Sequence, residues 1–97
     1  MEGKEMQRPR ILIVDDESSI RIALFRALEK KGFQIITASS LTEAESLTSG
    51  EQTIDVALLD LRLPDGDGLE FMSRLLKQNP NVQSLILTGF GTISGAI

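Results

Sequence analysis

Two apolar runs of the chain lead directly into acidic residues. Residues 11–14 (Ile-Leu-Ile-Val) are followed by Asp15 and Asp16, and residues 56–59 (Val-Ala-Leu-Leu) are followed by Asp60. Crowded carboxylates repel one another, and burying one of them costs several kcal/mol unless a cation or a hydrogen bond compensates. A divalent cation held among these acids would offset their repulsion.

The acids, the adjoining Glu17, and Thr88 at the end of a later apolar run each have an ordinary structural interpretation. Asp15, Asp16 and Glu17 would interact favourably with the dipole of a following helix. Asp60 alone would suit a turn, and Thr88 alone would suit the end of a β-strand. The functional interpretation therefore depends on whether the fold brings these side chains to one place.

The composition limits the chemistry that the chain can perform. The chain has 97 residues, 41% apolar and 25% charged, which suits one small globular domain. It contains neither cysteine nor histidine, so protein ligands to a metal must be oxygens, which favours Mg²⁺, Ca²⁺ or Mn²⁺. The net charge of −4 and the scattered Lys and Arg residues argue against direct nucleic-acid binding. No apolar run approaches the length of a membrane span, so we expect a cytoplasmic protein without membrane contact.

Strand-like and helix-like segments alternate along the chain. The strand-like segments are residues 10–14, 33–38, 55–60 and 82–88, and the helix-like segments are 19–31, 40–49, 67–79 and the beginning of one at 92–97. The first helix is expected to bury one face, made of Ile20, Ala23, Leu24, Ala27 and Leu28. Capping-box patterns begin the next two helices, at residues 40–43 and 67–70. The alternation predicts an α/β fold with a parallel sheet covered by helices on both faces.

This architecture would bring the acids together. In open parallel sheets, ligands bind beyond the carboxyl ends of the strands, where the direction of winding reverses. With strand order 2-1-3-4, the first and third strands are neighbours, so Asp15, Asp16 and Asp60 would share one edge. Thr88 would lie one strand further along. Three carboxylates without a histidine or cysteine suit Mg²⁺.

Three segments resemble the receiver domain of two-component response regulators. They are ILIVDDE at 11–17, VALLDLRLPDGDGLEF at 56–71 and LILTGFGT at 85–92. The motif DLRLPDGDGLE, followed by TGFGTI, is most similar to the corresponding motifs of receivers that precede sigma-54-type transcription activators. The resemblance covers essentially the whole chain, 1–97, and implies a flavodoxin-like (CheY-like) three-layer fold.

The resemblance also implies roles for individual residues. Asp60 would be the phosphoacceptor, taking a phosphoryl group from a histidine kinase. Asp15, Asp16, Asp60 and the backbone carbonyl of Arg62 would bind Mg²⁺, and Thr88 would hydrogen-bond the phosphoryl group. The module would then switch an output domain of its parent protein, as a phosphoprotein rather than a turnover enzyme.

The chain departs from the family pattern at its C-terminal end. The family has a fifth strand and a fifth helix, with a lysine at the end of that strand, whereas this chain stops at Ile97 and has no lysine after Lys77. We therefore expect a truncated receiver whose fourth strand is an open edge, which favours a homodimer or a rearranged oligomer. The alternative is a receiver-like interaction module that is not phosphorylated.

Three other functions fit the sequence less well. A haloacid-dehalogenase-type phosphatase would need an acid two residues after its nucleophile, but Arg62 follows Asp60 at that spacing. Glu17 follows Asp15 at that spacing, but without the Gly-Thr that should come next. A dinucleotide-binding loop at Gly89 and Gly91 would need its third glycine one residue earlier than Gly95. The Asp-Gly-Asp-Gly stretch at 65–68 lacks the acids at alternate positions ahead of the glycine that an EF-hand calcium-binding loop requires.

Overall fold

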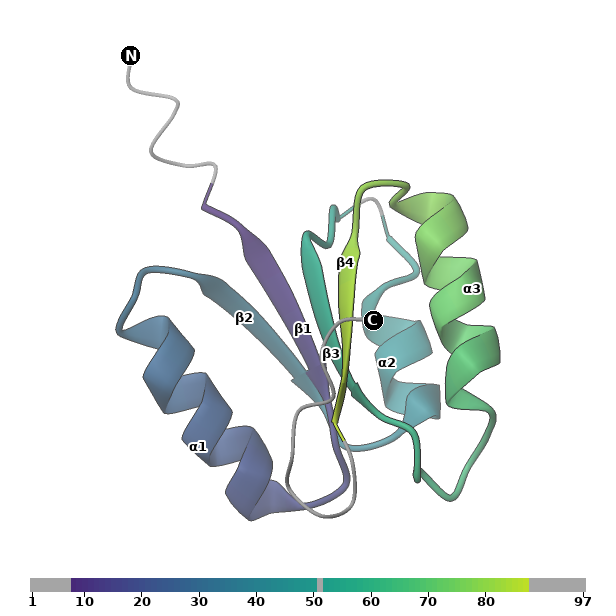
Figure 1. Ribbon diagram of the computed structural model, residues 1–97, viewed down its shortest axis with the longest axis horizontal. Helices are drawn as coiled ribbons and strands as arrows, with labels where there is room; N and C mark the ends of the chain where they lie inside the picture. Colours follow the sequence, from purple (N-terminus) through teal and green to yellow (C-terminus); the bar gives the residue numbers. More distant parts are fainter. Residues whose placement is uncertain (1–7, 51, 88–97) are drawn as a thin grey trace.

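The computed structural model describes residues 8–50 and 52–87, which form a four-stranded parallel sheet and three helices (Figure 1). The strands are β1 (Arg10–Val14), β2 (Gln34–Ala38), β3 (Val56–Asp60) and β4 (Gln83–Leu87), and the helices are α1 (Ser18–Glu29), α2 (Leu41–Leu47) and α3 (Gly68–Gln78). The strand order is β2-β1-β3-β4, with all pairs parallel, as the sequence predicted.

The helices cover opposite faces of the sheet. Helix α1 lies on one face, whereas α2 and α3 lie together on the other (Figure 1). The chain leaves β1 toward β2 in one direction and then returns across β1 to β3 and β4. Because parallel crossovers are right-handed, reversing the direction moves the connecting helix to the other face. The reversal lies between β1 and β3.

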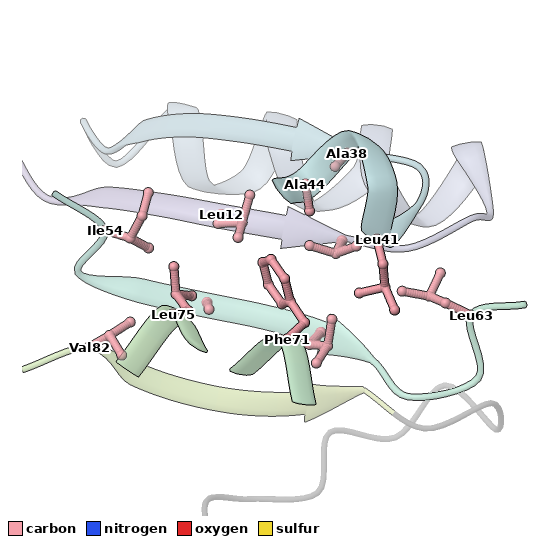
Figure 2. Packing of buried hydrophobic residues seen from close by; sticks show 12 residues of the cluster. Leu12, Ala38, Leu41, Ala44, Ile54, Leu63, Phe71, Leu75 and Val82 are labelled. Carbon is pink, nitrogen blue, oxygen red and sulfur yellow. The ribbon is translucent and has the colours of Figure 1, made fainter. Parts of the chain in front are cut away.

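The larger core lies beneath α2 and α3. Alternate residues of β1 and β3 point to this face, because side chains of a strand alternate between the two sides. Figure 2 shows how Phe71 and Leu75 of α3 point toward the strands, with Leu41 and Ala44 of α2 beside them. The twelve buried members of this cluster are Leu12, Val14, Ala38, Leu41, Ala44, Ile54, Ala57, Leu59, Leu63, Phe71, Leu75 and Val82.

The face beneath α1 is packed less completely. Its buried residues are Ile11, Ile13, Leu58 and Leu87, joined by the partly buried Leu24, Leu28, Phe33, Ile35, Val56 and Leu85. None of the twelve residues of α1 is itself buried. The prediction of a buried face was wrong for Ala23 and Ala27, which are exposed. Leu24 and Leu28, which are partly buried, make the contact of α1 with this face of the sheet.

The helix ends agree with the sequence to within about two residues. Helix α1 ends at Glu29 rather than at Lys31, and Gly32 follows with φ of +92°, a conformation that favours glycine. Ser40 caps α2 by accepting a hydrogen bond from the Glu43 amide at 3.0 Å. In a capping box, the Glu43 carboxylate would accept a hydrogen bond from the amide of the N-cap residue, Ser40. Here it accepts instead from the amide of Ser39, at 2.8 Å.

The other capping box begins α3, where Asp67 accepts hydrogen bonds from the amides of Leu69 and Glu70. The expected helix at 92–97 lies outside the described residues. None of the helices in the described part of the chain has the length and hydropathy that crossing a membrane requires.

Candidate functional site

Three acidic side chains meet at the carboxyl ends of β1 and β3. Val14 pairs with Leu59, so the next residue of each segment, Asp15 and Asp60, emerges at the same edge. One carboxylate oxygen from each of Asp15, Asp16 and Asp60 lies within 4.8 Å of the others. The expectation that these acids converge at the reversal of winding is therefore confirmed.

The three acids differ in exposure. Asp15 is 2% exposed and Asp60 is 8% exposed, whereas Asp16 is exposed. The site thus has two carboxylates at its floor and one at its rim.

Both buried acids are oriented by the backbone that follows them. Oδ1 of Asp15 accepts a hydrogen bond from the amide of Glu17 at 2.9 Å, and Oδ1 of Asp60 accepts one from the amide of Arg62 at 2.9 Å. Each bond spans two residues, the geometry of an Asx turn. These turns direct the two carboxylates before any ligand is bound.

The environment of Asp15 raises its pKa above the ordinary value for aspartate. Burial is the largest cause, because it disfavours the charged form, and repulsion from Asp60, Asp16 and Glu17 acts in the same direction. The hydrogen bond from the amide of Glu17 opposes both by stabilising the carboxylate. A cation at this edge would relieve the electrostatic cost of the charged form.

The donor set fits a hard divalent cation. Three carboxylates, two from the turn after β1 and one from the end of β3, offer oxygen ligands within reach of one another. The chain has no cysteine or histidine to attract a softer metal. The remaining predicted ligand is the backbone carbonyl of Arg62, which stays a prediction. Thr88, the predicted phosphoryl-binding residue, lies outside the described residues.

One contact of the site was not predicted from the sequence. Arg21, in the second turn of α1, donates a hydrogen bond from Nη1 to the backbone carbonyl of Asp15 at 2.7 Å. The amide of Asp15 donates in turn to the carbonyl of Ala38 at the end of β2, at 3.1 Å. The only signal in the sequence was an arginine six residues after Asp15 and five after Asp16.

A family model of the response regulator receiver domain matches residues 11–97. The chain belongs to this family. The match includes Asp15, Asp16 and Asp60, whose convergence at the sheet edge was described above.

The curated relatives of this receiver domain include regulatory proteins of several bacteria. The photosynthetic apparatus regulatory protein RegA of Rhodobacter capsulatus is 36% identical over 90% of this chain and 47% of its own length. The alginate biosynthesis transcriptional regulatory protein AlgB of Pseudomonas putida is 36% identical over the whole chain and 21% of its own length. The sporulation initiation phosphotransferase F of Bacillus subtilis is 34% identical over 91% of this chain and 70% of its own length. The chain thus spans about half the length of RegA and less of AlgB.

Solved structures give the same family and the same fold. A CheY-like receiver domain from Methanospirillum hungatei has a TM-score of 0.78 at 30% identity, covering 89% of this chain and 68% of that one. A response regulator from Burkholderia pseudomallei, with a phosphorylated aspartic acid, a calcium ion and citrate, has a TM-score of 0.75 at 30% identity, covering 84% and 47%. TrrA from Thermotoga maritima, in complex with Mg²⁺ and BeF, has a TM-score of 0.70 at 36% identity, covering 82% and 69%. The receiver domain described here is flavodoxin-like, as expected.

Proposed function

We propose that this receiver domain accepts a phosphoryl group on Asp60 from a histidine kinase, in a Mg²⁺-dependent reaction. The observation that carries the proposal is the convergence of Asp15, Asp16 and Asp60 within 4.8 Å, at the sheet edge of a receiver-family chain. Asp15, Asp16, Asp60 and the carbonyl of Arg62 are the proposed metal ligands. Thr88 is the proposed hydrogen-bond donor to the transferred group.

The hydrogen bond from the Arg62 amide gives Asp60 a defined orientation for this reaction. The bond occupies Oδ1, and we assign Oδ2 as the attacking oxygen. That oxygen forms a bond to phosphorus while the bond between phosphorus and the donor imidazole breaks, and the imidazole keeps the electron pair. When bound, Mg²⁺ would neutralise phosphoryl oxygens and allow a carboxylate to approach them. Asp15 and Asp16 serve the reaction by holding the cation beside Asp60.

Two related structures support this chemistry. The Burkholderia pseudomallei regulator carries a phosphorylated aspartic acid, and TrrA binds Mg²⁺ together with BeF. The names of RegA and AlgB support an output in regulation, and in AlgB's case in transcription. We propose that this domain likewise acts as a signalling module in the cytoplasm, switching an output domain, rather than as a turnover enzyme.

Mass spectrometry of the intact protein tests the phosphoacceptor. We expect incubation with acetyl phosphate and Mg²⁺ to add the mass of one phosphoryl group to the wild-type chain and to Asp55→Asn. Asp55 is a matched control because it precedes the opposite end of the same strand. Asp60→Asn should gain nothing, and omitting Mg²⁺ should prevent the gain in every variant. A folded wild-type chain that gains no mass would overturn the proposal and favour an interaction module that is not phosphorylated.

Self-association is a separate proposal. Strand β4 is an edge of the described sheet, and its Leu85 and Ile86 are only half-buried. An edge strand with apolar side chains is suited to contact with a second copy. Light scattering at micromolar concentration should give the mass of a dimer or a larger oligomer, and the mass of a monomer would contradict this.

A further inference from the structure

The segment that carries two of the proposed metal ligands is connected to α1 by Arg21. Nη1 of Arg21 donates to the Asp15 carbonyl at 2.7 Å, and the backbone amide of Arg21 donates to the carbonyl of Glu17 at 3.1 Å. Arg21 is half-buried. One residue therefore holds both ends of the segment 15–17.

This segment has few other restraints. Glu17, the N-cap residue of α1, makes no side-chain capping bond within the described part of the chain, and none of the α1 residues is buried. Within the described residues, the segment is also held by the bond from the Asp15 amide to Ala38, by the Asx turn to Glu17, and by a bond from the Ile20 amide to the Glu17 carbonyl at 3.2 Å. None of those bonds engages the carbonyl of Asp15.

That carbonyl belongs to the peptide group joining Asp15 to Asp16. Fixing its direction also fixes the direction in which the main chain enters Asp16. Asp16 is the exposed member of the cluster, so burial does not restrain its side chain. The direction of this peptide therefore helps to determine whether the Asp16 carboxylate stays within reach of Asp15 and Asp60.

We infer that Arg21 is a positioning residue for Mg²⁺, acting through its hydrogen bond to the Asp15 carbonyl to hold Asp16 in the ligand cluster. The inference rests on the proposed function, because it assumes that these acids bind Mg²⁺. Groups that orient metal ligands commonly change metal affinity by about 10- to 100-fold when they are removed.

Two effects of Arg21 on Mg²⁺ have opposite signs. Its positive charge repels a cation in the cluster, so charge alone predicts tighter binding when Arg21 is neutralised. Positioning predicts weaker binding after the same change, because the hydrogen bond is lost. The sign of the change in affinity separates the two effects.

Isothermal titration calorimetry of the chain with Mg²⁺ alone tests the inference. We expect Arg21→Met to weaken Mg²⁺ binding about tenfold. Arg21→Lys should recover part of the affinity, because an ammonium group keeps a donor. Arg26→Met is the matched control, since it removes the same charge from an exposed position near the other end of α1, and it should leave the affinity unchanged.

Thermal unfolding without Mg²⁺ provides the second readout. A residue with only a structural role would lower the melting temperature of Arg21→Met but leave the Mg²⁺ affinity of its folded state unchanged. Equal or tighter binding by Arg21→Met would overturn the inference. If Arg21→Met does not fold, Arg21→Ala, which likewise lacks a side-chain donor, replaces it, with the same expected and contradicting results.

The wild-type titration separates this inference from the proposed function. If the wild-type chain binds Mg²⁺ and Asp16→Asn weakens that binding, the metal site stands, and an unchanged Arg21→Met overturns only the role of Arg21. If the folded wild-type chain binds no Mg²⁺, both the metal site and the role of Arg21 are overturned.

Discussion

The two faces of the sheet are packed to different degrees. Beneath α2 and α3, twelve buried residues form one cluster in which Phe71 is 3% exposed and Leu75 is 2% exposed. Among residues 8–50 and 52–87, four buried residues beneath α1 are joined by side chains that are only partly covered, and α1 has no buried residue of its own. Apolar area removed from water is the main source of stability, so the first face should contribute more of it.

The difference shows how each helix is held in position. Helix α3 is positioned by large side chains that fill the core, whereas α1 depends more on hydrogen bonds at its beginning, including that of Arg21 to the Asp15 carbonyl. Asp15 and Asp16 of the candidate site lie in the turn between β1 and α1, and Asp60 is the last residue of β3. The proposed metal site therefore joins a strongly packed part of the molecule to a weakly packed one.

The largest expected effect comes from truncating one side chain on each face. Phe71→Ala should lower the free energy of unfolding by about 3–5 kcal/mol, because it leaves a cavity in a filled core. Leu24→Ala should cost roughly 1 kcal/mol, since Leu24 is only half-buried. Urea unfolding followed by circular dichroism measures both, as the chain has no tryptophan or tyrosine for fluorescence. Equal losses from the two variants would contradict the comparison.

A smaller effect is expected from Asp15, at the junction of the two faces. Its raised pKa means that its contribution to stability is full below the unfolded carboxylate pKa, near 4, and is lost as pH rises through the folded pKa. Without Mg²⁺, Asp15→Asn should therefore be more stable than wild type at pH 7. The difference should shrink as pH falls toward about 4.

Thermal unfolding at several pH values measures this effect. Asp16→Asn is the matched control. Asp16 is the neighbour of Asp15 in the chain, but its carboxylate is exposed, so neutralising it should change the stability less. Adding Mg²⁺ should stabilise wild type more than Asp15→Asn. A wild-type chain that is more stable than Asp15→Asn at pH 7 without metal would show that burial does not disfavour the charge.

The smallest effect is expected from Asp65, which connects the loop after β3 to α2. Its two carboxylate oxygens accept hydrogen bonds from the amides of Leu41 at 3.1 Å and Thr42 at 3.0 Å, and the Thr42 hydroxyl also donates to it. These bonds, the one from the Thr42 amide first, lower the pKa of Asp65. Asp65→Asn should destabilise the protein slightly at pH 7, because an amide offers only one acceptor oxygen.

The pH dependence of this change has the opposite sign to that of Asp15. The contribution of Asp65 is present above the unfolded carboxylate pKa and is lost as pH falls through the lower folded pKa. The difference between wild type and Asp65→Asn in thermal unfolding should therefore disappear in acid. Glu29→Gln, an exposed change at the end of α1, should have no such effect. A difference that persists in acid would show that the charge of Asp65 is unimportant.

Much of the fold could be predicted from the sequence because its signals are local. Apolar runs such as 56–59 indicated strands buried on both sides, and Ser40 and Asp67 indicated where two helices begin. The burial of α1 could not be predicted in the same way. Ala23 and Ala27 have the spacing of a buried face, but whether a short side chain is covered depends on how closely the helix and the sheet approach each other, which only tertiary packing sets.

The candidate site was likewise predicted only in part. The convergence of Asp15, Asp16 and Asp60 followed from strand order, because parallel strands end at a common edge. The bond that the Thr42 amide donates to Asp65 joins residues 23 positions apart and has no local signal in the sequence. The amide of Ile54 likewise donates to Oδ1 of the buried Asn79 at 2.9 Å, which connects the segment before β3 to the end of α3 without a local signal.

The acids and their places at the ends of strand-like runs were evident from the sequence, because these are local patterns, and their meeting at one sheet edge followed from the fold class. How two adjacent acids are divided between floor and rim became clear only from the packed fold. Asp15 is 2% exposed and Asp16 is exposed, although they are neighbours in the chain. Burial depends on what the neighbouring strands place around each side chain, and those contacts form only when distant segments pack.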